Sequence, residues 1–126
     1  MKTAHDLVAA ARARITECPV AEARSALLNA DVVLDVREPD EYAAGHLPGA
    51  INIPRGLLEF KVSATPALEK RDLAVVVYCK TGGRSALAAC SLQDMGYVSV
   101  QSIAGGFDAW VAQGGQIVRP EPLPFD

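Results

Sequence analysis

The chain has 126 residues, half of them hydrophobic, and a formal net charge of −3 at neutral pH. This length fits one domain with a buried core and leaves no room for two. The acidic balance argues against nucleic-acid binding, which needs a basic surface, and no apolar run approaches the roughly 18 residues of a membrane-spanning helix.

The N-terminal segment 1–15 alternates charged side chains with Ala and Leu and lacks the apolar stretch of a secretory signal. We therefore expect a cytoplasmic protein. The three cysteines, Cys18, Cys79 and Cys90, are odd in number and have no CxxC spacing. Such a set is a poor framework for disulfides or for a zinc site. We expect free thiols and no metal or other cofactor.

Helical and strand patterns alternate along the first half of the chain. Residues 5–16 place their apolar side chains on one helical face, and Pro19 suits the first turn of a second helix. The β-branched run 32–36 predicts a buried strand. A short helix that stops at Gly45 and a second short strand over 50–53 follow.

The second half continues the alternation after an ambiguous stretch of loop and short helix over 57–71. The apolar run 73–78 predicts the central strand of a parallel sheet that is covered on both faces. A helix over 85–95 follows, with Ser85 as its N-cap, and then a strand over 98–103 and a helix over 106–112. Alternation of this kind predicts an α/β fold.

The domain organisation follows from the same patterns. We expect a helical extension over 1–31 that packs on a domain over 32–115, followed by a Pro-rich extended tail over 116–126. In open parallel sheets, ligands bind beyond the carboxyl ends of the strands. The residues that follow Tyr78 are therefore the first place to look for chemistry.

The segment after the central strand reads Cys79-Lys80-Thr81-Gly82-Gly83-Arg84-Ser85 and leads into a helix. A loop there aims backbone N–H groups inward, and the helix dipole adds partial positive charge. Both glycines can take positive φ, which lets the amides converge on an anion, while the Lys and Arg add formal charge. These features predict a stabilised thiolate at Cys79, which would act as the nucleophile and could carry a persulfide.

A plainer interpretation is that Cys79 is an inert core thiol and that the glycines only form a turn, since cysteine is often buried for packing alone. The strand, Gly-rich loop and helix are also a phosphate-binding arrangement. For Cys90, which lies among apolar helical residues, and for Cys18, in a linker before Pro19, a structural role is favoured.

Arg37 follows the strand that ends at Val36 and should lie at the same edge of the sheet as Cys79. One interpretation is that it binds an anionic sulfur donor through bidentate contacts. The alternative is a structural ion pair with Glu38 or Asp40. Asp35 is expected to orient Arg37 or to cap a loop rather than to act as a base.

Taken together, these motifs resemble the rhodanese homology domain. The resemblance spans residues 32–115, and its combination of motifs is much more specific than any one of them. It is carried by four segments: Leu34-Asp35-Val36-Arg37-Glu38; Glu41-Tyr42 with Gly45-His46-Leu47-Pro48-Gly49-Ala50-Ile51-Asn52-Ile53-Pro54; Val77-Tyr78-Cys79-Lys80-Thr81-Gly82-Gly83-Arg84-Ser85; and Gly105-Gly106-Phe107-Asp108-Ala109-Trp110.

The resemblance implies a five-stranded parallel sheet flanked by helices on both faces and a catalytic cysteine at Cys79. In that family the cysteine takes a sulfane sulfur from a donor such as thiosulfate and passes it to cyanide or a thiol through a persulfide enzyme. The implied substrate-binding residues are Arg37, Lys80, Thr81, Gly82, Gly83, Arg84 and Ser85. The implied partners are a small anionic donor, a thiol or cyanide acceptor and a sulfur-acceptor protein, with no nucleic acid and no membrane.

The length of the loop distinguishes a sulfurtransferase from the main alternative, a phosphatase or arsenate reductase. Four residues lie between Cys79 and Arg84, whereas the related phosphatases and arsenate reductases have one more residue there. The shorter loop favours the sulfurtransferase form. A phosphatase or arsenate reductase, and a non-catalytic sulfur-relay or regulatory module, remain as alternatives.

Overall fold

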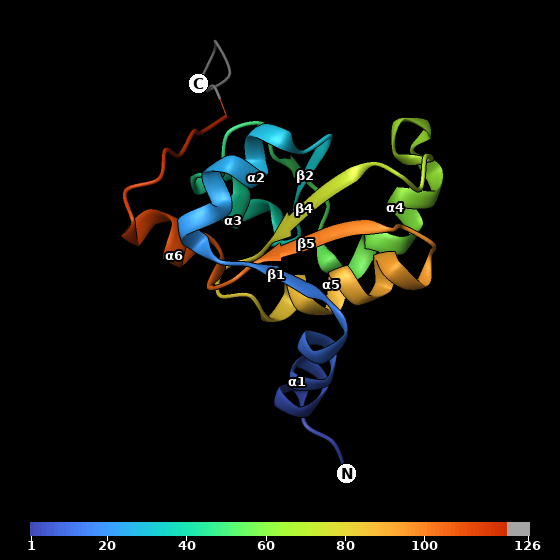
Figure 1. The fold of residues 1–126 in the computed structure, drawn as a ribbon. Coiled ribbons are helices and arrows are strands. Elements are labelled where there is room, and N and C mark those ends of the chain that lie inside the picture. Colours follow the sequence, from blue (N-terminus) through green and yellow to red (C-terminus); the bar gives the residue numbers. More distant parts are fainter. Residues whose placement is uncertain (121–126) are drawn as a thin grey trace.

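The polypeptide folds around a parallel sheet of five strands in the order β1-β5-β4-β2-β3. Figure 1 shows β1, β5, β4 and β2 side by side in this sheet. The computed structural model describes residues 1–120. The predicted fold class and strand number are confirmed. The strands are β1 (Thr16–Cys18), β2 (Val32–Asp35), β3 (Ile51–Asn52), β4 (Ala74–Tyr78) and β5 (Ser99–Ile103).

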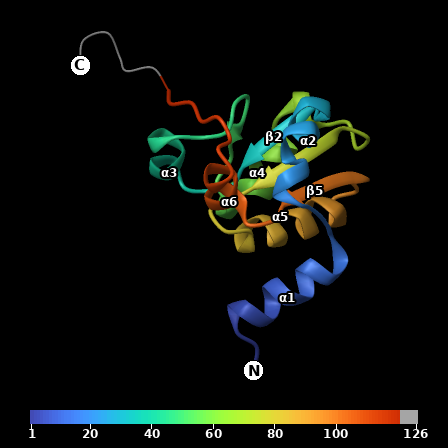
Figure 2. The same cartoon turned by 60° about the vertical axis from the view of Figure 1, so that its left-hand side comes forward.

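Helices cover both faces of this sheet (Figure 2). Side chains of α4 and α5 pack on one face, and those of α2 and α6 pack on the other. The first helix, α1, lies outside α5 and contacts it through a small apolar cluster. The helices are α1 (Ala4–Arg14), α2 (Ala23–Asn29), α3 (Pro39–Ala44), α4 (Leu58–Ala64), α5 (Gly83–Asp94) and α6 (Gly106–Ala112).

The central strand β4 holds the two halves of the core together. Because successive side chains of a strand point to opposite faces, Val75 and Val77 enter the core beneath α5, while Val76 and Tyr78 enter the core beneath α2 and α6. Burial of each such side chain contributes about 1.5–3 kcal/mol. The next residue, Cys79, continues the first series and is buried in the same core cluster as Val75 and Val77.

Two sequence predictions need correction at the ends of elements. The segment 1–31 is not purely helical, because it contains β1, which pairs with β5 at the edge of the sheet. Three residues are too few to show a period-2 pattern. The helix after the central strand does not begin at Ser85. Its N-cap is Gly82, whose φ of 109° belongs to the left-handed region.

The segment before the C-terminus contacts the domain. Val118 forms an antiparallel bridge with His46, and Ile117 packs against the core. The rest of the predicted Pro-rich tail, 121–126, lies outside the described residues. Within residues 1–120, no helix combines the length and the apolar character needed to cross a membrane.

Candidate active site

Cys79 sits at the carboxyl end of β4, directly before the N-terminus of α5, and its side chain is 1 % exposed. The backbone N–H of Gly82 donates to Sγ at an N···S distance of 3.1 Å, and the N–H of Ser85 at 3.4 Å. Only Gly82 takes positive φ; Gly83 is already helical. Two amides and the positive end of a helix therefore surround the sulfur, an arrangement that stabilises negative charge.

A pair of buried serines backs this sulfur site. Ser85 Oγ lies 3.5 Å from Cys79 Sγ and 2.8 Å from Ser102 Oγ on β5. Both serines are fully buried. Ser102 can donate to Ser85, which leaves the hydroxyl proton of Ser85 free to point at a sulfur anion. The role predicted for Ser85 as a helix cap is thus replaced by direct contact with the sulfur.

The N-terminus of α6 clamps the beginning of the loop. The backbone N–H of Phe107 donates to the carbonyl oxygen of Cys79 at 2.8 Å, and that of Asp108 donates to Lys80 at 3.0 Å. Such close approach of two backbones needs glycine. Gly106 has a φ of 58°, and a Cβ added to it would lie 2.5 Å from the carbonyl oxygen of Cys79.

Both cations of the loop are paired with carboxylates on neighbouring helices. Arg84 donates from its two terminal nitrogens to Glu41 of α3, at 2.7 and 3.1 Å. Lys80 lies 3.0 Å from a carboxylate oxygen of Asp108 on α6. Thr81, also predicted at the site, is exposed at the turn. The loop cations therefore act on the site as members of neutral pairs.

The Arg84–Glu41 pair predicts a pH dependence of stability. The hydrogen bond from Arg84 lowers the pKa of Glu41 from 4.5 to about 2. A carboxyl with a depressed pKa adds stability above its unfolded-state pKa and loses it as the pH falls through the folded value. We expect Glu41→Gln to cost about 1 kcal/mol of unfolding free energy at pH 7, for a partly exposed pair.

This deficit should shrink as the pH falls below 4.5 and should vanish near the folded-state value of about 2. Urea denaturation at a series of pH values measures it. Exposed Glu69, which has no ion pair within residues 1–120, supplies the matched control Glu69→Gln. A deficit that stays constant down to low pH would contradict the assignment.

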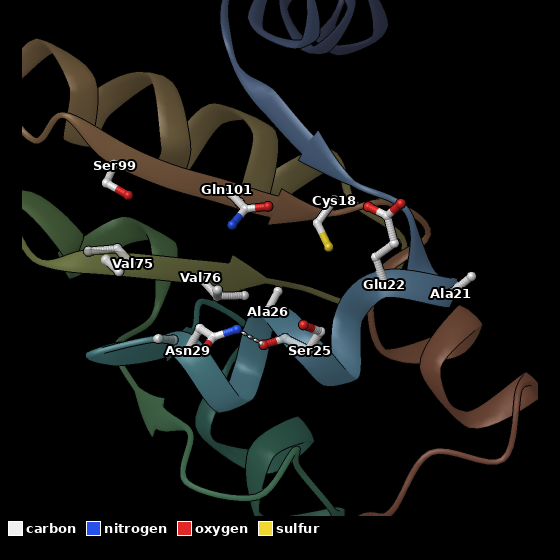
Figure 3. A pocket seen from close by; sticks show the side chains of 12 residues that line it. Cys18, Ala21, Glu22, Ser25, Ala26, Asn29, Val75, Val76, Ser99 and Gln101 are labelled. Atoms are coloured by element: carbon white, nitrogen blue, oxygen red, sulfur yellow. Dashed lines mark hydrogen bonds between the residues drawn. The ribbon is translucent and has the colours of Figure 1, made fainter.

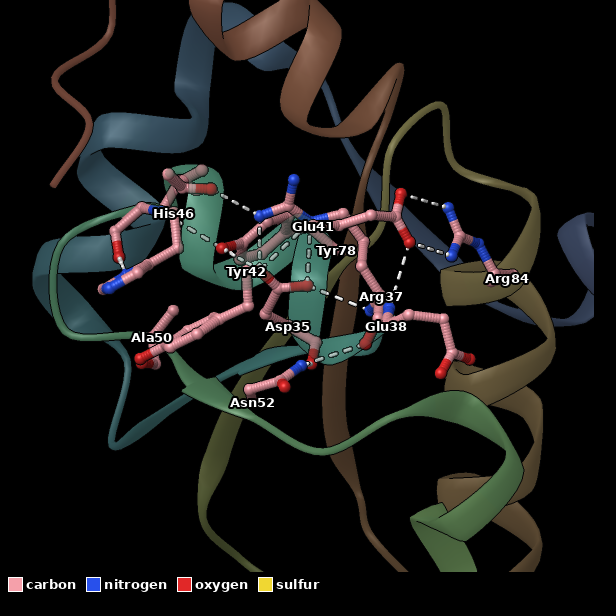
Figure 4. Close-up of polar contacts among 12 residues, drawn as sticks. Asp35, Arg37, Glu38, Glu41, Tyr42, His46, Ala50, Asn52, Tyr78 and Arg84 are labelled. Carbon is pink, nitrogen blue, oxygen red and sulfur yellow. Dashed lines mark hydrogen bonds and ion pairs between the residues drawn. The ribbon is translucent and has the colours of Figure 1, made fainter. Parts of the chain in front are cut away.

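A buried polar network lies beside the loop, around Asp35 at the end of β2 (Figure 4). Asp35 is fully buried and accepts hydrogen bonds from Arg37 and from the hydroxyl of Tyr78. Arg37 also donates to the carbonyl oxygen of Gly45 at 2.7 Å. Burial, followed by the charge of Asp35, raises the pKa of Tyr78, so its hydroxyl remains a donor. The prediction that Asp35 orients Arg37 is confirmed.

The ion pair predicted for Arg37 had the wrong partners, because Glu38 and Asp40 are exposed while Asp35 is buried beside the guanidinium. The side chain of Arg37 is only 4 % exposed, and the ring of Phe107 lies 4.3 Å from its Cζ atom. Within residues 1–120 its Nη1 has no hydrogen-bond partner. Arg37 lines a pocket of about 200 Å³ beside the loop.

We expect Asp35→Asn to lower the free energy of unfolding by about 3–5 kcal/mol, because it leaves the buried guanidinium of Arg37 without its counter-charge. Chemical denaturation measures the loss. Asp94→Asn is the matched control: it breaks an ion pair with Arg14 whose side chains are more than half exposed, and exposed pairs contribute about 0–1 kcal/mol. Equal effects of the two substitutions would refute this account.

The other two cysteines lie away from the loop. Cys90 is buried in α5 against α1. Cys18 is the last residue of β1, and burial raises the pKa of its thiol. Figure 3 shows Cys18 beside a hollow of about 490 Å³ between α2 and strands β4 and β5. Since none of the loop residues lines that hollow, it is separate from the site around Cys79.

Comparison with known proteins agrees with this geometry. The family described as "Rhodanese-like domain" matches residues 20–113. The chain belongs to the rhodanese family. A sulfurtransferase from Allochromatium vinosum is 40 % identical over 92 residues, which cover 72 % of this chain and 82 % of the relative. The chloroplastic thiosulfate sulfurtransferase 16 of Arabidopsis thaliana is 36 % identical over 104 residues, covering 75 % and 86 %.

Solved structures extend the match to the whole rhodanese fold. A Rhodopseudomonas palustris protein described as a possible tyrosine phosphatase superposes with a TM-score of 0.83 at 34 % identity, covering 94 % of this chain and 96 % of its own. The thiosulfate sulfurtransferase of Pseudomonas aeruginosa gives 0.71 at 34 % identity, covering 83 % of this chain and 20 % of its own. The relatives named sulfurtransferase support a sulfurtransferase activity.

Sequence reasoning missed three contributors to this rhodanese site. Ser102 was hidden in a strand, although a serine on the buried face of an apolar run is a usable signal for a polar contact. Gly106 and Asp108 lie on α6, after the loop in the sequence, and only the packing of α6 against the loop brings them to it. Tertiary packing therefore adds Ser102, Gly106 and Asp108 to the groups that the loop itself supplies.

Proposed function

We propose that this rhodanese transfers a sulfane sulfur from a thiosulfate-like donor to cyanide or a thiol through a persulfide on Cys79. One observation carries the proposal: Cys79 Sγ lies at the N-terminus of α5 within hydrogen-bond range of two backbone amides, those of Gly82 and Ser85. These donors suit a sulfur anion before transfer and a persulfide anion after it.

In the first half-reaction, the thiolate of Cys79 attacks the outer sulfur of thiosulfate. A sulfur–sulfur bond forms to Sγ, the sulfur–sulfur bond of the donor breaks, and its electron pair leaves with sulfite. Arg37 Nη1 is the group we assign to the departing oxyanion, because it has no hydrogen-bond partner among residues 1–120 and Arg37 lines the pocket beside the loop. The amides of residues 81–85 would hold the persulfide.

In the second half-reaction, cyanide or a thiolate attacks the outer sulfur of the persulfide. The bond to Sγ breaks, and the electron pair returns to Cys79 as the thiolate. The products are thiocyanate or a new persulfide, and no outside oxidant or reductant is consumed. We place this reaction in the cytoplasm, with a sulfur-acceptor protein as one candidate for the physiological thiol.

Intact-mass measurement after incubation with thiosulfate tests the proposal. The protein should gain the mass of one sulfur atom, and cyanide should remove it. Cys79→Ala should gain none, while Cys90→Ala, a change at a buried thiol of α5, should gain the same sulfur as the wild type. Sulfur on Cys79→Ala, or none on the wild type, would refute the proposal.

A phosphatase is the second candidate, because the Rhodopseudomonas palustris neighbour is described as a possible tyrosine phosphatase. The loop of four residues between Cys79 and Arg84 argues against it, since a tetrahedral phosphate needs a wider ring of amides. Hydrolysis of an aryl phosphate that is lost in Cys79→Ser would establish this alternative instead.

A further inference from the structure

The rim of the site carries equal numbers of positive and negative side chains. Four cations lie there, namely Arg12, Arg37, Lys80 and Arg84, and each forms an ion pair, with Glu17, Asp35, Asp108 and Glu41 respectively. The pocket of about 200 Å³ beside the loop is lined by Arg37, Glu41, Ala44, Gly45, Lys80, Phe107 and Asp108. Its charged walls are two cations and two carboxylates.

Such a balance weakens the attraction for a doubly charged ligand. A negatively charged ligand that enters the pocket is attracted by Lys80 and Arg84 but repelled by their carboxylate partners, Asp108 and Glu41. Repulsion between like charges is strong in a confined site. Nη1 of Arg37, which has no hydrogen-bond partner in the part of the chain that the structure describes, offers hydrogen bonds for one anionic group. The pocket is thus better matched to a ligand with one negative charge than to a dianion.

We infer that Asp108 and Glu41 determine donor specificity by neutralising Lys80 and Arg84, and that they favour a singly charged persulfide over the dianion thiosulfate. This inference rests on the proposed sulfur transfer. With a persulfide donor, the thiolate of Cys79 attacks the outer sulfur, a new sulfur–sulfur bond forms, and the donor's sulfur–sulfur bond breaks. The electron pair leaves with the donor thiolate, so the step needs no other reactant.

Asp108→Asn isolates the effect. The carboxylate of Asp108 contacts the ammonium of Lys80, whereas the bond from Asp108 to the loop comes from its backbone N–H, which asparagine keeps. We compare thiosulfate with the methanethiosulfonate anion, which carries one charge less and also donates its outer sulfur. The KM for thiosulfate should fall about threefold, a change typical of one exposed ion pair, and the KM for methanethiosulfonate should fall less.

Two further measurements, the dependence on salt and a second substitution, show whether the change of KM in Asp108→Asn comes from the local charge or from a change of structure. The gain in Asp108→Asn should disappear at high ionic strength because salt screens exposed charges. Lys80→Gln should raise the KM for thiosulfate in the Asp108→Asn background far more than in the wild type. Asp72→Asn, which makes the same change of net charge before β4, at the opposite end of that strand from Cys79, should leave the ratio of the two KM values unchanged.

The outcomes distinguish this inference from the proposed function. A wild-type protein that accepts sulfur from neither donor would refute both. An active wild type whose ratio of KM values does not change in Asp108→Asn, or changes equally in Asp72→Asn, would overturn the inference and leave the sulfur transfer intact.

Discussion

Cys79→Ala should lower thiosulfate-to-cyanide transfer by about 10³-fold or more, because it removes the only atom on which the proposed persulfide can form. The loss should appear in kcat and in kcat/KM together, measured as thiocyanate production. The side chain is 1 % exposed and small, so the substitution should cost only about 1 kcal/mol of stability. The fold should therefore survive, as circular dichroism would show.

The other thiols make this a sharp test. Cys18→Ala and Cys90→Ala remove buried sulfurs of the same kind that lie away from the loop. Both variants should keep wild-type kcat. Full activity in Cys79→Ala, or loss of activity in either control variant, would contradict the assignment of the reaction to the end of β4.

Gly106→Ala should be nearly as damaging, although Gly106 has no functional group. Its φ of 58° is unfavourable for alanine, and the new Cβ would lie 2.5 Å from the carbonyl oxygen of Cys79 and 2.7 Å from that of Lys80. The backbone of the loop must then retreat from α6. A misplacement of about 1 Å at a reacting group costs about 10²-fold in rate, and strain plus overpacking should cost about 3 kcal/mol of stability.

Gly114→Ala separates these two causes. Gly114 also has a positive φ, 85°, but a Cβ there would meet no atom within 4 Å. This variant should show only the backbone strain of about 1 kcal/mol and normal kcat. If Gly106→Ala transferred sulfur at the wild-type rate, the contact between α6 and the loop would have no part in shaping the site.

The sequence predicted those parts of the site whose residues lie close together along the chain. The loop from Cys79 to Ser85 was recognisable because its cysteine, glycines and helix start are contiguous, and local backbone geometry largely follows local sequence. The exact start of α5 was not recognisable, because serine is a favoured N-cap residue. Only the contacts of Ser85 with Cys79 and Ser102 show that it lies against the sulfur instead.

The ion pairs of the site, in contrast, were not predicted from the sequence. Lys80 and Arg84 suggested a positively charged loop, but their carboxylate partners lie 28 and 43 residues away along the chain. Arg37 was expected to pair with its sequence neighbours, and instead pairs with Asp35 inside the core. Which charges meet is decided by which elements converge at one edge of the sheet.

By itself, the sequence determined the α/β architecture and the central strand and indicated Cys79 as the candidate nucleophile, because hydrophobic periodicity and a contiguous loop encode these features directly. The tertiary structure alone decided three further features: the edge strand β1, the clamp of α6 on the loop and the neutral rim around Cys79. Each of these depends on contacts between segments far apart in the chain, whose pairing follows from the packing of helices and strands rather than from any local pattern.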